Sequence, residues 1–499
     1  MHGLRFIFVI LAMALQPVAY AQLRVEVGAS EAILGGGRLL VFVRSINQDE
    51  GLPEAVDGSA FEPDGVVIAA REVSGFAPGQ VVGLDGDDLS FPATLAELAS
   101  GTYAVQAVLD HDHSYAYSGR GPGDVLSEVA MIRLESKPAK ISLRLQRIVP
   151  AYSQWQTPWA PAPTGKELAA LTNVATHFEV DSPALKGFHG RQVSIRGIVV
   201  RPLDYGTTAD LLPVVYFTHG FGGGLPTLND TAMGLVRQMK SGNMPRLIWI
   251  LLDQSGPMGT HEFADSLNNG PWGTALTTEL IPYIESNYRA DARVGARFLL
   301  GHSSGGWAAL WAQLSYPSVF GGAWATSPDY SDFTDFGGTD LTAPSAVVKS
   351  TSLARMEQVL GEYGGQTTSF EAVWSPRGGD GRPMPLFDRN SGVVDPVVAQ
   401  WWRAHWDLTE KVRKEWNSNR AMLDGKLHVI VGTQDQFDLD DSARRLQAAV
   451  KLVNGDAEFT YVPGKGHFDL YVKGTDRAGL RRSMAWEMWR EAKGISRTE

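Results

Sequence analysis

The sequence has no cysteine among its 499 residues. This absence excludes disulfide bridges, thiolate chemistry and a lipidated N-terminal cysteine. The apolar core alone must therefore hold the fold of the mature chain. The hydrophobic fraction of 44%, with 20% charged residues, is typical of a folded globular protein with a sizeable core.

Clusters of basic residues are also lacking. Lysine and arginine number 44 against 55 aspartates and glutamates, which gives a formal net charge of −11. No dense Lys/Arg run interrupts this balance, and such a chain disfavours nucleic acid and anionic lipid as partners. Beyond the N-terminus, no stretch of the sequence reaches the length of a transmembrane helix.

The N-terminus has the pattern of a secretory signal peptide over residues 1–21. Arg5 supplies the positive charge, Phe6–Leu15 forms an apolar stretch of ten residues, and a small-x-small cleavage site follows at Ala19–Ala21. A membrane anchor is the alternative, but ten apolar residues are too few to span a bilayer. We expect an exported protein, periplasmic or secreted, with no membrane span after signal cleavage.

Short apolar runs separated by Gly, Pro and Asp turn residues make up residues 22–150. Ile141, Leu143 and Leu145 alternate with polar residues, which is the pattern of a strand with one solvated face. Strands at this spacing predict a smaller all-β domain, an antiparallel, Ig-like β-sandwich. Residues 151–167 are rich in Pro and aromatic side chains and are predicted to be a linker.

Residues 168–499 combine continuous apolar strands with amphipathic helices. The predicted strands cover residues 192–200, 213–220, 246–253, 297–302, 321–328, 427–435 and 458–464. The predicted helices cover residues 274–288, 306–316 and 442–453. This alternation predicts an α/β fold, a mostly parallel sheet with helices on both faces. Residues 331–425 fit the alternation poorly, and we expect them to form a cap or insertion over the strand ends.

A G-x-S-x-G motif, Gly301–Gly305, lies where a predicted strand meets a predicted helix. In such a sharp turn the central serine, Ser303, is exposed above the sheet as a nucleophile, and the glycines allow strand and helix to approach closely. Ser304 follows, and its backbone N–H can face a developing oxyanion. The alternative is a glycine-rich turn with a merely exposed serine. His302 is not expected to be the base, because successive residues in this turn diverge.

A second glycine-rich segment, His219–Gly222, follows the predicted strand at residues 213–220. It matches the oxyanion loop that hydrolases place between a strand and a helix, and Phe221 N–H is the preferred second donor. Gly220 and Gly222 remain alternative donors. A phosphate-binding loop is disfavoured because G-x-x-x-x-G-K-[ST] is absent.

A serine nucleophile needs a base, and that base needs an orienting acid. His467 lies between glycine-rich residues just after the last predicted strand, and Asp435 ends the strand before it. The order Ser303, Asp435, His467 is that of an α/β-hydrolase triad. The other candidate acids are Asp438, Asp440 and Asp441 in the same turn and, after an earlier strand, Asp329 and Asp332. For the latter two we prefer helix capping and turn formation.

Three segments together carry a family resemblance: SPALKGFHGRQVSIRGIVVRPLDY, PVVYFTHGFGG, and ELIPYIESNYR followed by RFLLGHSSGGWAALW. They resemble the putative-esterase family of α/β-hydrolases, whose members include esterase D, enterochelin esterases and feruloyl esterases. The resemblance covers about residues 178–325 and returns at 427–471. It implies hydrolysis of an ester by a serine, without a cofactor, with Ser303, Asp435 and His467 as the triad. Several enterochelin-esterase-type relatives also carry an N-terminal β-sandwich.

The remaining candidates have weaker signals. Trp401, Trp402 and Asp253 are predicted to contribute to the substrate pocket, although tryptophans of this kind more often pack a cap helix. Arginines in the insertion could pair with a substrate carboxylate, but ordinary loop ion pairs are the preferred interpretation; they are Arg377, Arg382 and Arg389. A divalent metal could bind the polar segment that contains Asp110, His111, Asp112, His113 and Asp124. We prefer a polar connection there and expect no metal site.

We therefore expect an exported serine esterase that acts on a small-molecule carboxylic ester through an acyl-enzyme. Two other enzymatic activities stay open, acyl transfer to an alcohol and peptide hydrolysis. A non-catalytic binding protein on a hydrolase fold is the alternative from another class, but it usually lacks a triad residue.

Overall fold

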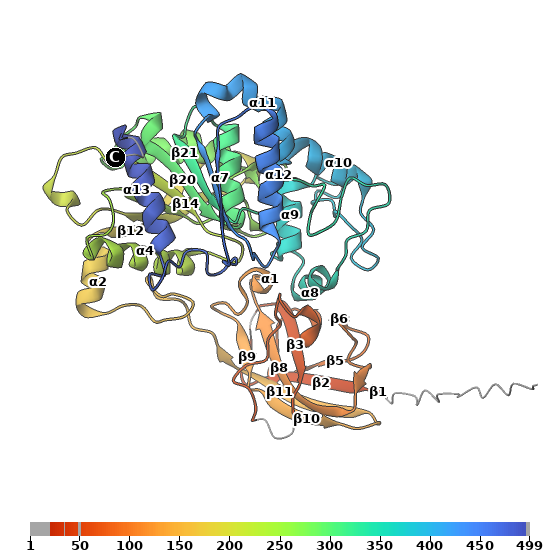
Figure 1. Cartoon of the computed structure of the whole chain (residues 1–499). Coiled ribbons are helices and arrows are strands. Elements are labelled where there is room, and N and C mark those ends of the chain that lie inside the picture. Colours follow the sequence, from red (N-terminus) through yellow and green to blue (C-terminus); the bar gives the residue numbers. More distant parts are fainter. Residues whose placement is uncertain (1–19, 34, 48–50, 496–499) are drawn as a thin grey trace, which may run out of the picture. The chain divides into compact units, whose positions relative to one another are not determined.

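The computed structural model describes residues 20–33, 35–47 and 51–495 (Figure 1). Residues 1–19, which hold most of the expected signal peptide, lie outside the described residues. The chain divides into two compact units. The first runs to His111 and resumes at Asp124–Ile148, and the second consists of Asp112–Gly123 and Val149–Glu499. The segment Asp112–Gly123 therefore belongs to the second unit, although it lies inside the stretch predicted to be a sandwich.

The first unit is all-β, as predicted, and it is built on one continuous sheet. Its nine strands follow the order β5-β2-β11-β9-β8-β3-β4-β6, with β10 paired to β8. They are β2 (Leu23–Ala29), β3 (Gly37–Ser45), β4 (Val67–Val73), β5 (Val81–Leu84), β6 (Leu89–Phe91), β8 (Gly101–Asp110), β9 (Val125–Ser127), β10 (Ala130–Leu134) and β11 (Ala139–Ile148). A short pair, β1 (Tyr20–Ala21) and β7 (Leu98–Ala99), lies apart from this sheet. All these pairings are antiparallel except that of β11 with β2, which departs from the antiparallel pattern expected.

The second unit contains an eight-stranded sheet in the order β12-β13-β15-β14-β20-β21-β22-β23. The strands are β12 (Ala175–Asp181), β13 (Ser194–Val200), β14 (Val214–Thr218), β15 (Ile248–Leu252), β20 (Arg297–His302), β21 (Gly322–Thr326), β22 (Leu427–Gly432) and β23 (Glu458–Val462). The first two strands pair antiparallel, and from β15 onward every pairing is parallel. Two small hairpins accompany the sheet, β16 (Ser255–Gly256) with β17 (Gly259–Thr260) and β18 (Asp265–Ser266) with β19 (Gly270–Pro271).

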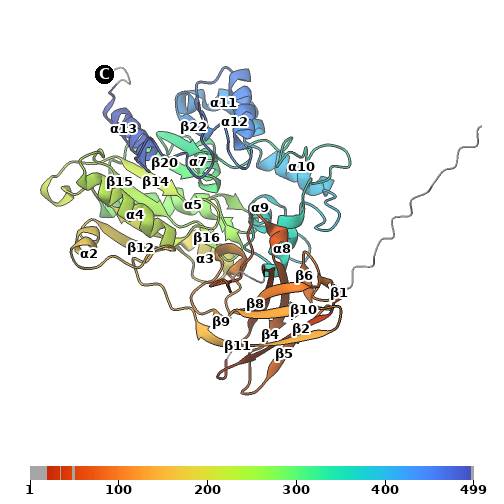
Figure 2. The same cartoon turned by 60° about the horizontal axis from the view of Figure 1, so that its bottom comes forward.

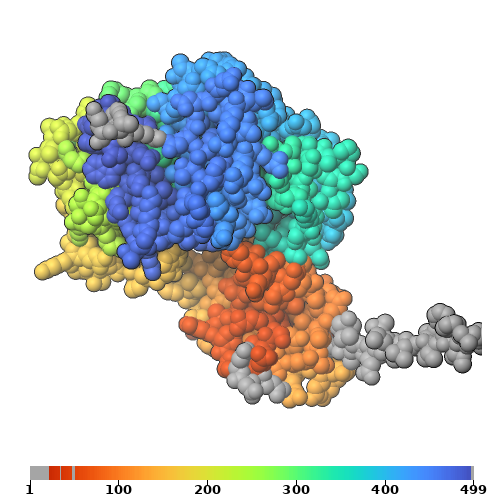
Figure 3. All heavy atoms as spheres, in the orientation of Figure 1, coloured from red at the N-terminus to blue at the C-terminus, as the bar shows by residue number. Residues whose placement is uncertain are grey.

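Helices bury both faces of this sheet, which confirms the predicted α/β-hydrolase architecture. Val215 and Phe217 of β14 belong to one apolar cluster, and their neighbours Val214 and Tyr216 belong to another. Because successive side chains of a strand point to opposite faces, both faces of β14 are covered. The helices of the hydrolase framework are α2 (Gly165–Thr172), α3 (Pro183–His189), α4 (Leu225–Lys240), α5 (Trp272–Ala275), α6 (Ile281–Asn287), α7 (Ser304–Ser315), α12 (Leu439–Leu452) and α13 (Gly479–Lys493). Helices α12 and α13, in blue, reach the molecular surface in Figure 3.

The single helix predicted at residues 274–288 is divided into three parts. A π-helical turn, η3 (Leu276–Leu280), lies between α5 and α6, and Pro282 stands in the first turn of α6. Proline has no N–H to donate to the preceding turn, which explains why regular α-helical bonding is interrupted before it. No helix in the described part of the chain is long and apolar enough to cross a membrane.

The insertion at 331–425 begins with loops, as expected, and then forms four helices. They are α8 (Ser352–Leu360), α9 (Gln366–Trp374), α10 (Pro396–His405) and α11 (Leu408–Leu423), drawn in cyan and blue in Figure 2. Buried tryptophans of these helices share one apolar cluster with Trp307 of α7. The predicted linker packs against the second unit. Trp155 is buried in the core of that unit, and Asn229 donates to the carbonyls of Gln154 and Gln156.

Candidate active site

Ser303 stands between β20 and α7 with φ 59° and ψ −126°. A positive φ is unfavourable for a residue with a side chain, so the surrounding structure must hold it. Its N–H donates to the Thr326 carbonyl at 3.0 Å, and its own carbonyl accepts the N–H groups of Gly306 and Trp307. The strand-to-helix turn therefore leaves the Ser303 side chain partly exposed at the carboxyl end of the strand.

The motif glycines allow three segments to meet behind this serine. A Cβ on Gly301 would collide with the carbonyl of Gly305, and a Cβ on Gly305 would collide with the carbonyls of Thr218 and His219. Strand β20, helix α7 and the end of β14 can therefore approach this closely only because no side chain is present at either position.

The loop after β14, residues 219–224, packs directly against the serine; we call it the oxyanion loop. A Cβ added to Gly220 would lie 3.2 Å from Cβ of Ser303 and 3.8 Å from its Oγ. Ser304 is the first residue of α7, where a backbone N–H has no partner within the helix. Within the loop, the Gly223 N–H donates to the Gly220 carbonyl and the Gly224 N–H donates to the Thr227 hydroxyl. The Ser304 N–H and the N–H groups in the first part of the loop, which include that of Phe221, are therefore the candidate oxyanion donors.

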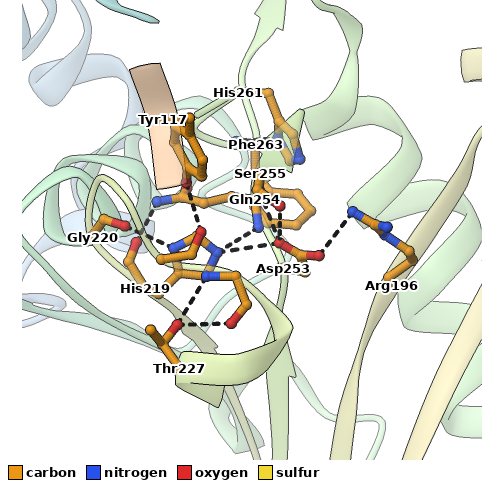
Figure 4. Close-up of polar contacts among 12 residues, drawn as sticks. Tyr117, Arg196, His219, Gly220, Thr227, Asp253, Gln254, Ser255, His261 and Phe263 are labelled. Carbon is orange, nitrogen blue, oxygen red and sulfur yellow. Dashed lines mark hydrogen bonds and ion pairs between the residues drawn. The ribbon is translucent and has the colours of Figure 1, made fainter. Parts of the chain in front are cut away.

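The His219 ring fixes the start of the oxyanion loop (Figure 4). Its Nε2 accepts the Gln254 N–H at 3.0 Å, which leaves Nδ1 to donate to the Gly220 carbonyl at 2.7 Å. Asp253 lies behind it, with Oδ1 3.4 Å from Nε2 of His219 and Oδ2 3.0 Å from Arg196. Burial would raise the pKa of Asp253, but His219, Arg196 and Ser255 outweigh it and lower that pKa to about 2.

Asp253 was predicted to contribute to the substrate pocket, and the structure gives it a different place. Its side chain is 4% exposed, and Ser255 donates to it through both its N–H and its hydroxyl. Both oxygens of the Asp253 carboxylate are therefore bonded to protein groups. We infer that Asp253 supports the oxyanion loop and does not bind substrate. The sequence placed it at the correct strand end but could not show its neighbours.

Asp435 and His467 follow the adjacent strands β22 and β23 and are hydrogen-bonded to each other. Nδ1 of His467 lies 2.9 Å from Oδ2 of Asp435, and both residues are buried. The Phe437 N–H donates to Oδ1 of Asp435, and Gln436 accepts the His467 N–H at 2.7 Å. Burial would raise the pKa of Asp435, but the hydrogen bond and charge of His467 hold it below its usual value. The imidazole is thus held by an ionised carboxylate through Nδ1. Its other nitrogen, Nε2, can accept a proton from a hydroxyl.

Asp329 is hydrogen-bonded to the Ser303 side chain. Its Oδ1 accepts the Ser303 hydroxyl at 3.2 Å, and its Oδ2 accepts the Ser304 hydroxyl at 2.6 Å. Burial raises the pKa of Asp329 to about 6, partly offset by these hydroxyls and by the charge of His467. The capping role preferred from the sequence therefore misses the contact of Asp329 with Ser303.

The other candidate acids are engaged locally. Asp332 accepts the N–H and hydroxyl of Thr334, and Asp440 and Asp441 form ion pairs with Arg444 within α12. Asp438 precedes that helix with a positive φ of 55°. The His302 ring centroid lies 4.5 Å from that of His467, and burial, with a further contribution from His467, lowers the pKa of His302 to about 3. His302 is therefore neutral at physiological pH.

The tryptophans of the insertion are packing residues. Trp402 is only 1% exposed, and its indole N–H donates to Ser375, so the predicted contact with substrate does not fit. Trp401 stacks on His405 at 3.8 Å between ring centroids and packs against the same apolar cluster. A large aromatic side chain gives the same sequence signal whether it fills a core or lines a pocket.

The arginines of the insertion have protein partners. Arg389 pairs with Glu371 at 2.6 Å, and Arg382 pairs with Glu362 at 2.6 Å. Arg377 donates to the Leu267 carbonyl and lies over the Phe188 ring. Arg389 and Arg382 therefore form the ion pairs preferred from the sequence, and Arg377 contacts a carbonyl and a ring instead.

In the polar segment weighed as a metal site, carboxylate oxygens of Asp110, Asp112 and Asp124 lie within 4.8 Å of one another, so the expectation of no metal site stays a prediction. The ring of His111 lies 3.0 Å from the Gly36 carbonyl, and Asp112 accepts the Ser114 N–H at 3.0 Å. Sequence reasoning missed a tyrosine a few residues further on. Tyr117 donates from its hydroxyl to the Gly223 carbonyl at 2.8 Å, and no local pattern pointed to this contact.

Comparisons with known proteins agree on a family. The family model described as Putative esterase matches residues 192–492. Curated esterases from two strains of Mycobacterium tuberculosis are each 32% identical over 141 residues, 28% of this chain and 30% of their own length. The match thus spans less than a third of those relatives.

Solved structures give more distant matches. A ferulic acid esterase is 17% identical with a TM-score of 0.42, covering 64% of this chain and 98% of its own. An S-formylglutathione hydrolase from Agrobacterium tumefaciens is 15% identical with a TM-score of 0.39, covering 64% of this chain and 95% of its own. Since the family model covers more than half of the sequence, the chain belongs to the putative esterase family of α/β-hydrolases.

Proposed function

We propose that this chain is an exported serine esterase that hydrolyses a small-molecule carboxylic ester through an acyl-enzyme. Ser303 is the nucleophile, His467 the general base and Asp435 the orienting acid. The observation that carries the proposal is the hydrogen bond of 2.9 Å between His467 and Asp435. These two residues follow β23 and β22, at the same edge of the parallel sheet where Ser303 follows β20 with a positive φ. The family membership supports ester hydrolysis as the reaction, and the signal-like residues 1–21 support export.

The reaction starts when Ser303 Oγ attacks the ester carbonyl and Nε2 of His467 takes its proton. Asp435 is ionised and stabilises the imidazolium that forms. The N–H groups of Ser304 and Phe221 hold the oxyanion of the tetrahedral intermediate. When the intermediate collapses, the imidazolium gives its proton to the leaving alcohol. Water, deprotonated by His467, then attacks the acyl-enzyme, and the acid leaves as Ser303 recovers its proton.

The largest expected effect is that of Ser303→Ala. Hydrolysis of a nitrophenyl ester should fall by about 10⁴-fold or more, because the acyl-enzyme cannot form. Labelling by a fluorophosphonate probe, read by intact mass, should disappear. Ser304→Ala is the matched control: it removes the neighbouring hydroxyl but keeps the backbone N–H, and it should still be labelled. Unchanged ester hydrolysis by purified Ser303→Ala would refute the proposed mechanism.

A further inference from the structure

Tyr117 lies far in sequence from every residue assigned to the reaction, yet it contacts the oxyanion loop. It sits on the short helix α1 (Tyr115–Ser118), between β8 and β9 of the first unit. The segment Asp112–Gly123 that carries it belongs to the second unit by its contacts. Figure 4 shows the ring directed at the loop that includes His219 and Gly220.

Contacts from Tyr117 reach consecutive residues of the loop. The hydroxyl donates to the Gly223 carbonyl at 2.8 Å. The ring meets that of Phe221 edge-on, with 5.2 Å between centroids and 81° between planes. The Tyr117 carbonyl lies close to Gly222, since a Cβ there would be 3.6 Å from its oxygen. Helix α1 therefore braces the middle of the loop.

The two ends of the loop have other supports. His219 holds the start through the Gly220 carbonyl, and the Thr227 hydroxyl holds the end through the N–H and carbonyl of Gly224. The middle is rich in glycine and includes Gly222 at φ 72°, so its own side chains fix it poorly. A backbone N–H that stabilises an oxyanion must be held close to its productive position.

The phenol is suited to be a permanent donor. Burial raises the pKa of Tyr117 well above its usual range, and the negative charges of Asp253 and Glu262 raise it further. The hydroxyl therefore keeps its proton, and with it the bond to the Gly223 carbonyl, throughout the pH range in which an esterase works.

We propose that Tyr117 is a positioning residue for the oxyanion loop, holding the Phe221 N–H in place through the Gly223 carbonyl and the Phe221 ring. This inference rests on the proposed function, in which the loop binds the oxyanion. Among the described residues, the contacts of Tyr117 with the site are with this loop and not with Ser303, Asp435 or His467, so we infer that it acts through the loop.

The test is Tyr117→Phe in the full chain, which removes one oxygen and keeps the ring. We expect kcat for a nitrophenyl ester to fall about 5- to 20-fold, less than the roughly 10²- to 10³-fold loss caused by deleting an oxyanion donor, because the donor is kept and only its support is lost. KM should change less than twofold. A trifluoromethyl ketone, which forms a tetrahedral adduct with the serine, should bind more weakly by the same factor as kcat/KM.

Tyr103→Phe is the matched control, because the Tyr103 hydroxyl also donates to a backbone carbonyl, that of Ala99, at 2.9 Å in the first unit. It should leave kcat and inhibitor affinity unchanged. If Tyr117→Phe is recovered unfolded, Phe221→Leu is the second test: it removes the other contact, between the Tyr117 and Phe221 rings, and keeps the backbone N–H, and it should also lower kcat at constant KM.

The outcomes separate the two proposals. An unchanged kcat in Tyr117→Phe, a rise in KM alone, or an equal loss in Tyr103→Phe would overturn the role of Tyr117. If Ser303→Ala is inactive while Tyr117→Phe behaves as the wild type, only this inference fails. If Ser303→Ala retains activity, the proposed function fails first.

Discussion

Asp435 and Asp329 follow the neighbouring strands β22 and β21, both are buried, and both interact with the charge of His467, yet their pKa values move in opposite directions. Asp435 accepts a hydrogen bond from the imidazole, which outweighs the cost of burial and keeps the carboxyl ionised. Asp329 accepts only hydroxyls in the contacts described, from Ser303 and Ser304, and its pKa rises to about 6.

The contrast shows that position at a strand end does not decide which carboxylate supports the base. A carboxylate that accepts a bond from imidazole can stabilise the imidazolium formed during the reaction. A carboxyl among hydroxyls near neutral pH is a mixture of charged and neutral forms, and it is poorly suited to that task. The proposed mechanism therefore gives the orienting role to Asp435, and equivalent substitutions of the two aspartates test this choice.

The largest difference should appear with Asp435→Asn. The amide cannot stabilise the imidazolium and favours the wrong tautomer of His467, so kcat should fall on the order of 10³- to 10⁴-fold, as in other Ser-His-Asp triads. Steady-state hydrolysis of a nitrophenyl ester measures this loss. A variant that keeps more than a tenth of wild-type activity would show that Asp435 is not the triad acid.

Asp329→Asn should be much milder. The asparagine carbonyl can still accept the Ser303 hydroxyl, so we expect a loss of about tenfold or less in the same assay. The expected order of activities is wild type, Asp329→Asn and then Asp435→Asn. If Asp329→Asn loses more activity than Asp435→Asn, the acid lies after β21, as the alternative from the sequence allowed.

A last comparison of the two aspartates concerns stability against pH. The pKa of Asp329 is about 6 in the folded chain against 3.8 as its ordinary value, so between those values the folded protein keeps a proton that the unfolded chain releases. Stability should therefore fall as pH rises from about 4 to 6, by roughly 3 kcal/mol at most. Asp435 acts in the opposite sense, because its pKa is lowered and its contribution is lost as the solution becomes acidic.

Asp329→Asn has no proton to lose, so its stability should decline less over this window than that of the wild type. Urea unfolding of both proteins at pH 4.5 and pH 7 provides the comparison, with Asp332→Asn as a control that changes an equivalent charge in a local turn. Parallel changes in the wild type and Asp329→Asn would contradict the raised pKa of Asp329.

Much of the architecture could be predicted from the sequence because its signals are local. Buried parallel strands such as β14 and β15 are continuous apolar runs, and the G-x-S-x-G pattern placed Ser303 in a turn between strand and helix. Asp435 and His467 could be predicted as triad residues because the carboxyl ends of parallel strands lie at one edge of the sheet. The structure places them 2.9 Å apart.

What could not be predicted depends on contacts distant in sequence. Tyr117 and Gly223 are 106 residues apart, and no sequence motif near either residue predicts their hydrogen bond. Trp402 is an aromatic residue on an amphipathic helix, and only its packing shows that it lies in a core. The contact of Asp329 with Ser303 depends on the backbone conformation of the loop after β21, which the sequence pattern does not predict.

The path of the chain also limits how this enzyme can be divided or recombined. The chain leaves the first unit after His111, returns to it at Asp124 and leaves it again after Ile148. A gene fragment that starts at Val149 would encode the whole hydrolase sheet but would omit α1 and Tyr117. A single crossover at Val149 would therefore transfer the hydrolase sheet without Tyr117. To keep the contact between Tyr117 and the oxyanion loop, a recombinant chain must also inherit the preceding β-rich stretch.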